Sequence, residues 1–418
     1  MEYGSSMSLL RRRDFRLIFV AFALSHVGDY LALITLTLRI EAGTNSGWAV
    51  AALLLTGLVP PLLLAPLVGL LVDRVETVRV LVIASLFQAA AAGALAFTPG
   101  VAPTLALSFV LGAGVAVTQP ALFALLPRAV GEDRVTQGNA YLEVARWGGA
   151  AAGPVLAATI TDAFGAQTAL LANAGTFLVV AALVPLLRVR RPPQPAPAEE
   201  RGRGEARQGV AFLIRDPMLR LVVPILGLMI VFAAADNVAE VFFAKDVLVA
   251  GDTGYGVLIT TWTLGMVVGS TATGRWARPA ALAPVVLVGA VVGGSAVVVA
   301  AATAVFPIAV AMFFVGGVAN GVELVSMRSL LHHRVPDRLR GRAFAAYYGM
   351  VQGAQILALG ASGGLVEAAG ARMTMLYAGI GTAAVGVLGA LLYSRIPSRE
   401  RRMAAPAPAH HHEPWVPA

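Results

Sequence analysis

The chain has 418 residues, of which 58% are hydrophobic and 13% charged, and its mean hydropathy is +0.77. This composition excludes a water-soluble globular protein, which needs more polar surface to cover its core, and favours lipid as the solvent. The sequence holds no cysteine, which excludes disulfides, thiolate metal sites and thiol catalysis. Its only lysine is Lys245, so the chain lacks the Walker A lysine that a P-loop ATPase uses to bind nucleotide phosphates.

Apolar segments with the length that a bilayer requires, about 20 residues, recur along the whole chain. The first six lie at residues 15–38, 48–71, 80–97, 102–126, 139–160 and 168–187. The second six lie at residues 218–244, 254–274, 281–302, 305–330, 343–366 and 373–394. The first segment is too long for a signal peptide, so we expect it to be retained as a helix. The sequence therefore predicts an all-α membrane protein with twelve transmembrane helices.

Almost all of the 31 basic residues fall in alternate gaps between these segments, beginning with Arg11, Arg12, Arg13 and Arg16 before the first. Only Arg39, Lys245 and Arg372 lie in the other set of gaps. By the positive-inside rule, this pattern predicts a multi-pass membrane protein whose two termini and long central loop are cytoplasmic. The basic pI of about 10.4 then reports topology, and we expect no nucleic-acid partner.

The two sets of six segments resemble each other. A shift of 207 residues places Asp29 on Asp236, and a shift of 204 places Asp133 on Asp337. The sequence therefore predicts two pseudo-symmetric six-helix bundles with a site between them at the middle of the membrane, as in one class of secondary transporter. The expected divisions are a cytoplasmic N-terminus at 1–14, bundles at 15–187 and 218–395, a solvated linker at 188–217 and a disordered cytoplasmic tail at 396–418.

The gap after the second segment contains Gly69-Leu70-Leu71-Val72-Asp73-Arg74, followed by Arg79. This run is similar to the loop signature of the major facilitator superfamily, which the chain resembles over residues 8–395. The resemblance implies a gating loop in which Asp73 caps the next helix or accepts hydrogen bonds from arginines of neighbouring loops. Residues 76–78 depart from the fuller signature, which has glycine and basic residues there.

A second run, Gly149-Ala-Ala-Ala-Gly153-Pro154 in the fifth segment, resembles a signature associated with antiporters of that family. Glycines four residues apart let another helix approach closely, and Pro154 bends its own helix. Tight packing alone is the alternative explanation. Residues 120–128 and 335–342 resemble the branch that holds bacterial proton-driven drug, macrolide and siderophore exporters, and this resemblance implies the plasma (inner) membrane of a bacterium.

Acidic residues inside the apolar segments are the candidates for proton coupling, because a charge at a helix centre is costly and usually faces a cavity or a partner. Asp29 lies in the middle of the first segment, with His26 one turn earlier on the same face. Asp236 and Glu240 are one turn apart in the seventh segment. Two carboxylates this close disfavour double ionisation, so we expect one of them to hold a proton. A buried network that ties helices together is the alternative.

Neutral polar and aromatic residues inside the segments could form the walls of a substrate cavity. The candidates are Gln119, Asn320, Phe232, Trp262, Tyr347 and Gln352. Helix packing is the alternative role for each. Glu143 and Arg146 are three residues apart and are expected to neutralise each other, whereas the spacing of Glu323 and Arg328 does not place them on one face.

These features favour a secondary active transporter that exports an amphiphilic, drug-like small molecule in exchange for protons. A cationic or neutral cargo would suit acidic residues in the cavity. The alternatives are export of a specific metabolite such as a siderophore, uptake by symport, and a non-transporting scaffold or receptor on the same fold. We expect the partners to be the substrate, protons and the lipid bilayer. We expect a monomer, no metal or other cofactor, and no enzymatic activity, because no nucleophile and base lie together in the sequence.

Overall fold

The computed structural model describes residues 9–191, 203–276 and 281–397, and the regular elements in these ranges are all helical. Ten of the described helices are long and apolar enough to cross a membrane. Two of the ten, α5 (Val135–Leu183) and α12 (Asp337–Ser394), turn back on themselves at a glycine with positive φ. These glycines are Gly165, with φ 83°, and Gly370, with φ 78°. Because α5 and α12 each contribute two legs, the twelve predicted membrane-spanning segments are confirmed.

The N-terminal half consists of α1 (Arg13–Thr44), α2 (Gly47–Arg74), α3 (Thr77–Phe97), α4 (Val101–Val130) and α5. Short 3-10 turns at Glu132–Arg134 and Val184–Leu186 flank α5. The helices begin and end close to the predicted positions because glycine, proline and charged residues interrupt the apolar runs there.

The C-terminal half begins with α7 (Leu219–Ala233), α8 (Asp236–Phe242) and a π-helical turn, η4 (Phe243–Val247), which together form one membrane-spanning segment. It continues with α9 (Gly251–Trp276), α10 (Leu282–Thr303), α11 (Phe306–Arg334) and α12. The break between α7 and α8 lies directly before Asp236, so this acid opens a helix in the middle of the span.

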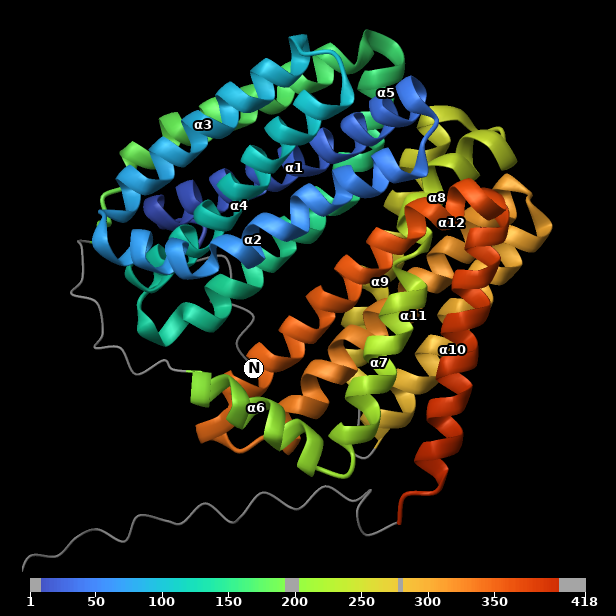
Figure 1. The fold of residues 1–418 in the computed structure, drawn as a ribbon. Coiled ribbons are helices and arrows are strands. Elements are labelled where there is room, and N and C mark those ends of the chain that lie inside the picture. The colour runs from blue at the N-terminus through green and yellow to red at the C-terminus, as the bar shows by residue number, and fades with distance from the viewer. Residues whose placement is uncertain (1–8, 192–202, 277–280, 398–418) are drawn as a thin grey trace, which may run out of the picture.

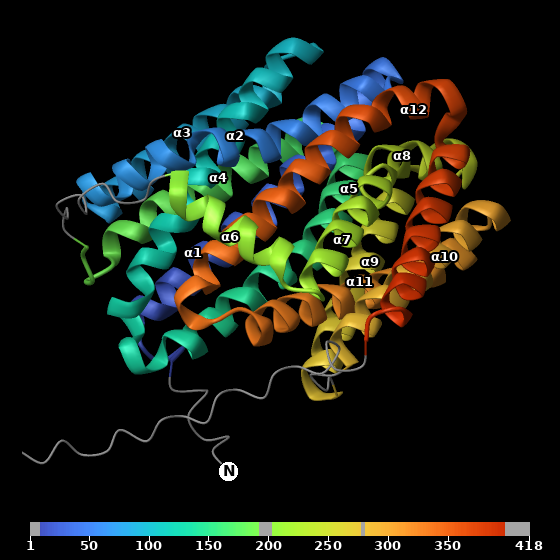
Figure 2. The ribbon, with the colours of Figure 1, turned by 60° about the horizontal axis from the view of Figure 1, so that its bottom comes forward.

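The segment 188–217, expected to be a solvated linker, contains the helix α6 (Arg203–Arg215). Leu213 of α6 is buried, and Gly209 lies directly against the backbone of Arg342 in α12. Figure 2 shows α6 lying across one end of the molecule beside the first leg of α12. Apolar residues at helical spacing within an otherwise polar segment explain why part of this segment packs.

The two halves meet at one end of the molecule and diverge at the other (Figure 1). We call the end where α1 begins at Arg13 and α12 ends at Ser394 the terminal end, and the end of the Gly165 and Gly370 bends the far end. One buried apolar cluster at the far end contains residues of both halves, including Ile34 and Leu258. Towards the terminal end each half has its own apolar cluster. The halves are therefore packed together at the far end and separated at the terminal end.

Candidate substrate and coupling site

Asp29 lines a cavity of about 210 Å³ inside the N-terminal half, between α1, α2, α4 and the second leg of α5. The wall is mostly apolar, with Phe177 and several leucines, but it also contains Ser108 and Asn173. The hydroxyl of Ser108 and the amide nitrogen of Asn173 are buried without a hydrogen-bond partner among the described residues. Buried polar groups of this kind ordinarily bind water or a ligand. The cavity therefore combines a carboxyl group with two unused hydrogen-bonding groups.

His26 is bound by partners other than Asp29. Its Nδ1 donates to the carbonyl of Phe22 at 3.0 Å, which leaves Nε2 to accept from the amide of Gln119 at 3.4 Å. The ring also stacks on Phe22, with centroids 4.2 Å apart. Since both nitrogens are occupied, the predicted pairing of His26 with Asp29 is not formed in this structure. Gln119, a predicted cavity residue, instead lines a cavity of about 570 Å³ between α2 and α4.

Three carboxyl groups gather inside the C-terminal half. Asp236 and Glu240 are each 7% exposed and lie one turn apart on α8, close enough to interact electrostatically. Glu323 of α11 shares a small pocket of about 50 Å³ with Asp236. None of these three acids forms an ion pair with a described residue. Acidic side chains are therefore concentrated here without a basic side chain paired to them among the described residues.

Asn320 and Trp262, both predicted cavity residues, line the same pocket as Asp236 and Glu323. The indole packs edge-on against Phe313, with centroids 5.9 Å apart. Sequence reasoning grouped Glu323 with Arg328 as a structural or gating residue and so left it outside the coupling group. The structure adds Glu323 to this group because α8, α11 and α12 all line this pocket.

The remaining predicted cavity residues lie apart from this pocket. Phe232 packs on Gly381 in the second leg of α12. Tyr347 is only 3% exposed and belongs to the apolar cluster at the terminal end of the C-terminal half. Gln352 is half-buried on the first leg of α12.

The glycines of the predicted antiport motif lie where α1 crosses α5. A Cβ atom added to Gly149 would come within 2.9 Å of the Cβ of His26, and one added to Gly153 within 2.5 Å of the Cβ of Tyr30. Pro154 lies at the contact between the halves, because a Cβ on Gly256 of α9 would be 2.8 Å from the Pro154 carbonyl. The motif therefore contacts α1, which carries the coupling candidates His26 and Asp29, and also α9 of the C-terminal half.

The predicted gating run forms the last turn of α2, which ends at Arg74. The side chains of Gly69 and Asp73 lie outside what the structure describes, so the role of Asp73 stays a prediction. Glu76, which departs from the family signature, pairs with Arg79 at 3.2 Å and with Arg190 at 3.3 Å. Arg74 is exposed. Glu76 is therefore an acid at this turn that is paired with arginines.

The architecture and sequence place the chain in a known family. The family model of the Major Facilitator Superfamily matches residues 18–248 and 228–417, and these two matches together span nearly the whole sequence. The chain belongs to the major facilitator superfamily, and it is a multi-pass membrane transporter of that class. No curated protein sequence matches it significantly.

Several solved transporters share the fold at low sequence identity. A POT family transporter in complex with 5-aminolevulinic acid matches with a TM-score of 0.71 and 11% identity over 92% of this chain and 96% of that one. The nucleoside transporter NupG matches with a TM-score of 0.70 and 13% identity over 91% of this chain and 99% of its own. A bacterial homolog of the human lysosomal transporter Spinster, in an inward-facing and occupied conformation, matches with a TM-score of 0.71 and 12% identity over 97% and 100%. At these identities the likeness concerns the fold alone.

Proposed function

We propose that this transporter exports an amphiphilic small molecule in exchange for protons. The observation that carries the proposal is the set of carboxyl groups inside the spans without a basic partner among the described residues, the half-buried Asp29 in one half and the buried Asp236 and Glu240 with the half-buried Glu323 in the other. A carboxyl group removed from water and unpaired favours binding a proton or a cationic group over remaining charged. Competition between these two ligands for the same acid couples their movements in opposite directions.

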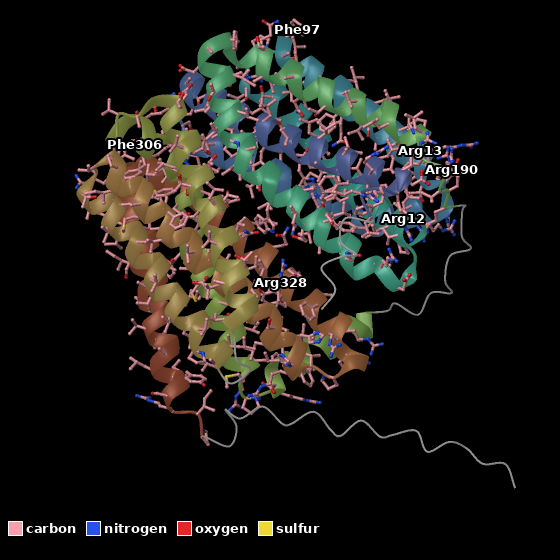
Figure 3. All side chains as sticks on the ribbon, turned by 180° about the vertical axis from the view of Figure 1, so that it is seen from behind. Arg12, Arg13, Phe97, Arg190, Phe306 and Arg328 are labelled. Atoms are coloured by element: carbon pink, nitrogen blue, oxygen red, sulfur yellow. The ribbon has the colours of Figure 1, made fainter. Side chains whose placement is uncertain are left out.

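The proposed orientation places the terminal end in the cytoplasm of a bacterium. The support is the position of the arginines, since the labelled Arg12, Arg13 and Arg190 gather at the terminal end of the N-terminal half in Figure 3. The labelled Phe97 and Phe306 lie at the far end. Arginine-rich termini and loops remain in the cytoplasm during insertion. In this orientation the structure is open towards the cytoplasm, where an exporter collects its cargo.

The test is internal pH in proteoliposomes that contain the purified protein, while amphiphilic amines are added with and without an imposed proton gradient. We expect compound-dependent proton movement for the wild type and at least a tenfold loss for Asp29→Asn and Asp236→Asn, because an amide cannot carry the proton. Asp162→Asn removes an exposed acid of α5 and should retain the wild-type rate. Undiminished proton movement in both cavity variants would contradict the proposal.

A further inference from the structure

Arg328 of α11 differs from four other arginines within the spanning helices. Each of these four binds a named oxygen: Arg39 the Leu95 carbonyl at 2.6 Å, Arg146 the Glu143 carboxylate at 2.6 Å, Arg334 the Asp216 carboxylate at 3.4 Å and Arg372 the Ala302 carbonyl at 2.7 Å. Within the part of the chain that the structure describes, Arg328 has no ion pair and no hydrogen bond to an oxygen. It is a cation inside a membrane helix without a counter-charge beside it.

The surroundings of Arg328 hold it in place without neutralising it. Its guanidinium lies over the ring of Tyr348, 5.9 Å from the centroid, and its Nε is buried without a hydrogen-bond partner. Tyr348 is 40% exposed, so this wall of α11 and α12 is accessible. Figure 3 shows the labelled Arg328 on the side of the C-terminal half that is turned towards the N-terminal half. The arginine is therefore positioned by an aromatic ring at the space between the halves.

Glu323, the acid nearest in sequence on α11, lies outside ion-pair distance of Arg328. Their separation of five positions corresponds to about 7.5 Å along the helix axis, with the two side chains on different faces. Glu323 instead faces the pocket that it shares with Asp236. Tyr347 lies between the two groups and is close enough to interact electrostatically with both. In the C-terminal half, the acids Asp236 and Glu323 thus lie together in one pocket, and the guanidinium of Arg328 lies separately, closer to the terminal end.

We propose that Arg328 binds a carboxylate of the transported molecule, which makes the cargo a zwitterionic amphiphile. An unpaired guanidinium within a membrane helix is costly, and its planar fork matches a carboxylate in a bidentate arrangement. This inference rests on the proposed function, in which the cationic group of the cargo competes with protons for the acids. The carboxylate on Arg328 then fixes the orientation of the cargo. The expected spacing between the two charged groups of the cargo is roughly that between Glu323 and Arg328 along α11.

The test compares two probes that differ only in the carboxylate, a rhodamine dye with its free acid and the methyl ester of the same dye. Binding to the purified full-length protein in nanodiscs is measured by fluorescence anisotropy, which requires no proton coupling. We expect the wild type to bind the acid at least about tenfold more tightly than the ester, which is typical of a charge-assisted pair. In Arg328→Gln the two probes should bind equally, and Arg328→Lys should restore part of the preference because it restores the charge.

The control is Arg372→Gln, which removes an arginine of the same half that is bound to the carbonyls of Ala301 and Ala302 at the far end. It should leave the preference for the acid intact. A wild type that binds the acid no better than the ester, or an Arg328→Gln variant that keeps the preference, would overturn the assignment and indicate that water alone solvates Arg328. A wild type that shows no compound-dependent proton movement in proteoliposomes but still binds the acid more tightly than the ester would contradict the proposed antiport. The carboxylate site at Arg328 would then still be supported.

Discussion

At the scale of single residues, the crossing of α1 and α5 depends on the absence of side chains at two positions. A Cβ atom on Gly153 would lie 2.5 Å from the Cβ of Tyr30, closer than carbon atoms approach without a shift of the backbone. Nothing lies within 4 Å of the corresponding position on Gly148, one residue before Gly149 on the same helix. An alanine at Gly153 therefore tests the packing of α1 against α5, whereas an alanine at Gly148 tests helix propensity alone.

We predict that Gly153→Ala destabilises the protein by about 1–3 kcal/mol, because overpacking forces the two helices apart. The measurement is the midpoint of thermal unfolding in detergent. Gly148→Ala is the matched control, since its methyl group enters open space and alanine favours the helix. Equal unfolding temperatures for the two variants would show that α1 and α5 yield to the methyl group without cost.

The sequence identified charged residues inside the spans, but it could not identify their partners. The cost of burying a charge in lipid singles out Asp29, Asp236 and Glu240 from their positions within apolar segments. The partner of His26 is Gln119, which is distant in sequence and belongs to α4. Such contacts depend on how helices rotate and cross, which the pattern of apolar residues determines only within about one turn. The sequence therefore predicted which residues are candidates for the site, but not which of them contact one another.

At the scale of elements, sequence prediction was most accurate where a long apolar run ends in glycine or charge. The twelve spans were correct within a few residues, since hydrocarbon thickness sets their length. The break between α7 and α8 was not predicted, because no proline or glycine lies between Ala233 and Asp236. The packed part of 188–217 was also missed, because its few apolar residues are diluted by charge.

The bend of α5 at Gly165 yields a prediction at this scale. The backbone there has φ 83° and ψ 157°, a region that residues with a Cβ rarely adopt. No atom lies within 4 Å of an added Cβ, so an alanine would meet only backbone strain. We expect Gly165→Ala to lower the free energy of unfolding by about 1–3 kcal/mol.

The control for the bend is Gly175→Ala, in the second leg of α5. Gly175 also has open space around its Cβ position, but its backbone is helical. Alanine should stabilise the helix there by up to about 1 kcal/mol. The two variants should therefore move the midpoint of thermal unfolding in opposite directions, and movement in the same direction would mean that the bend adapts to alanine.

At the scale of the whole molecule, the far end is held together by polar contacts between the halves. The Nζ of Lys245 lies 2.5 Å from the Glu41 carboxylate of α1 and 3.0 Å from the Asp252 carboxylate of α9. Ser46 donates to Glu367 of α12 at 2.6 Å, and the backbone amide of Trp48 donates to the same carboxylate at 3.5 Å. Transport by rocking of two bundles requires these contacts to break when the far end opens.

Glu41→Gln tests whether this ionic cluster holds the far end closed. Glu41 is 5% exposed, so removal of its charge leaves Lys245 paired only with the more accessible Asp252 and weakens the closed state. Because the chain has no cysteine, spin labels can be introduced at Ala42→Cys and Val305→Cys, exposed positions of opposite halves at the far end. We expect the distance distribution between the labels to gain a longer component in Glu41→Gln.

The rate of chemical labelling of Lys245 is an independent measure of how often the far end opens. As the only lysine, it is the one side-chain amine in the protein, and mass spectrometry of its peptide separates it from the terminal amine. A membrane-impermeant amine reagent should modify Lys245 roughly fivefold faster in Glu41→Gln, a change that corresponds to about 1 kcal/mol. Asp162→Asn, which removes an exposed acid from the far end without breaking a described ion pair, should change neither the labelling rate nor the distance distribution. Faster labelling with unchanged distances would mean that Glu41 only shields the amine of Lys245. A change in both the labelling rate and the distances would show that the ion pairs of Lys245 hold the two halves together at the far end.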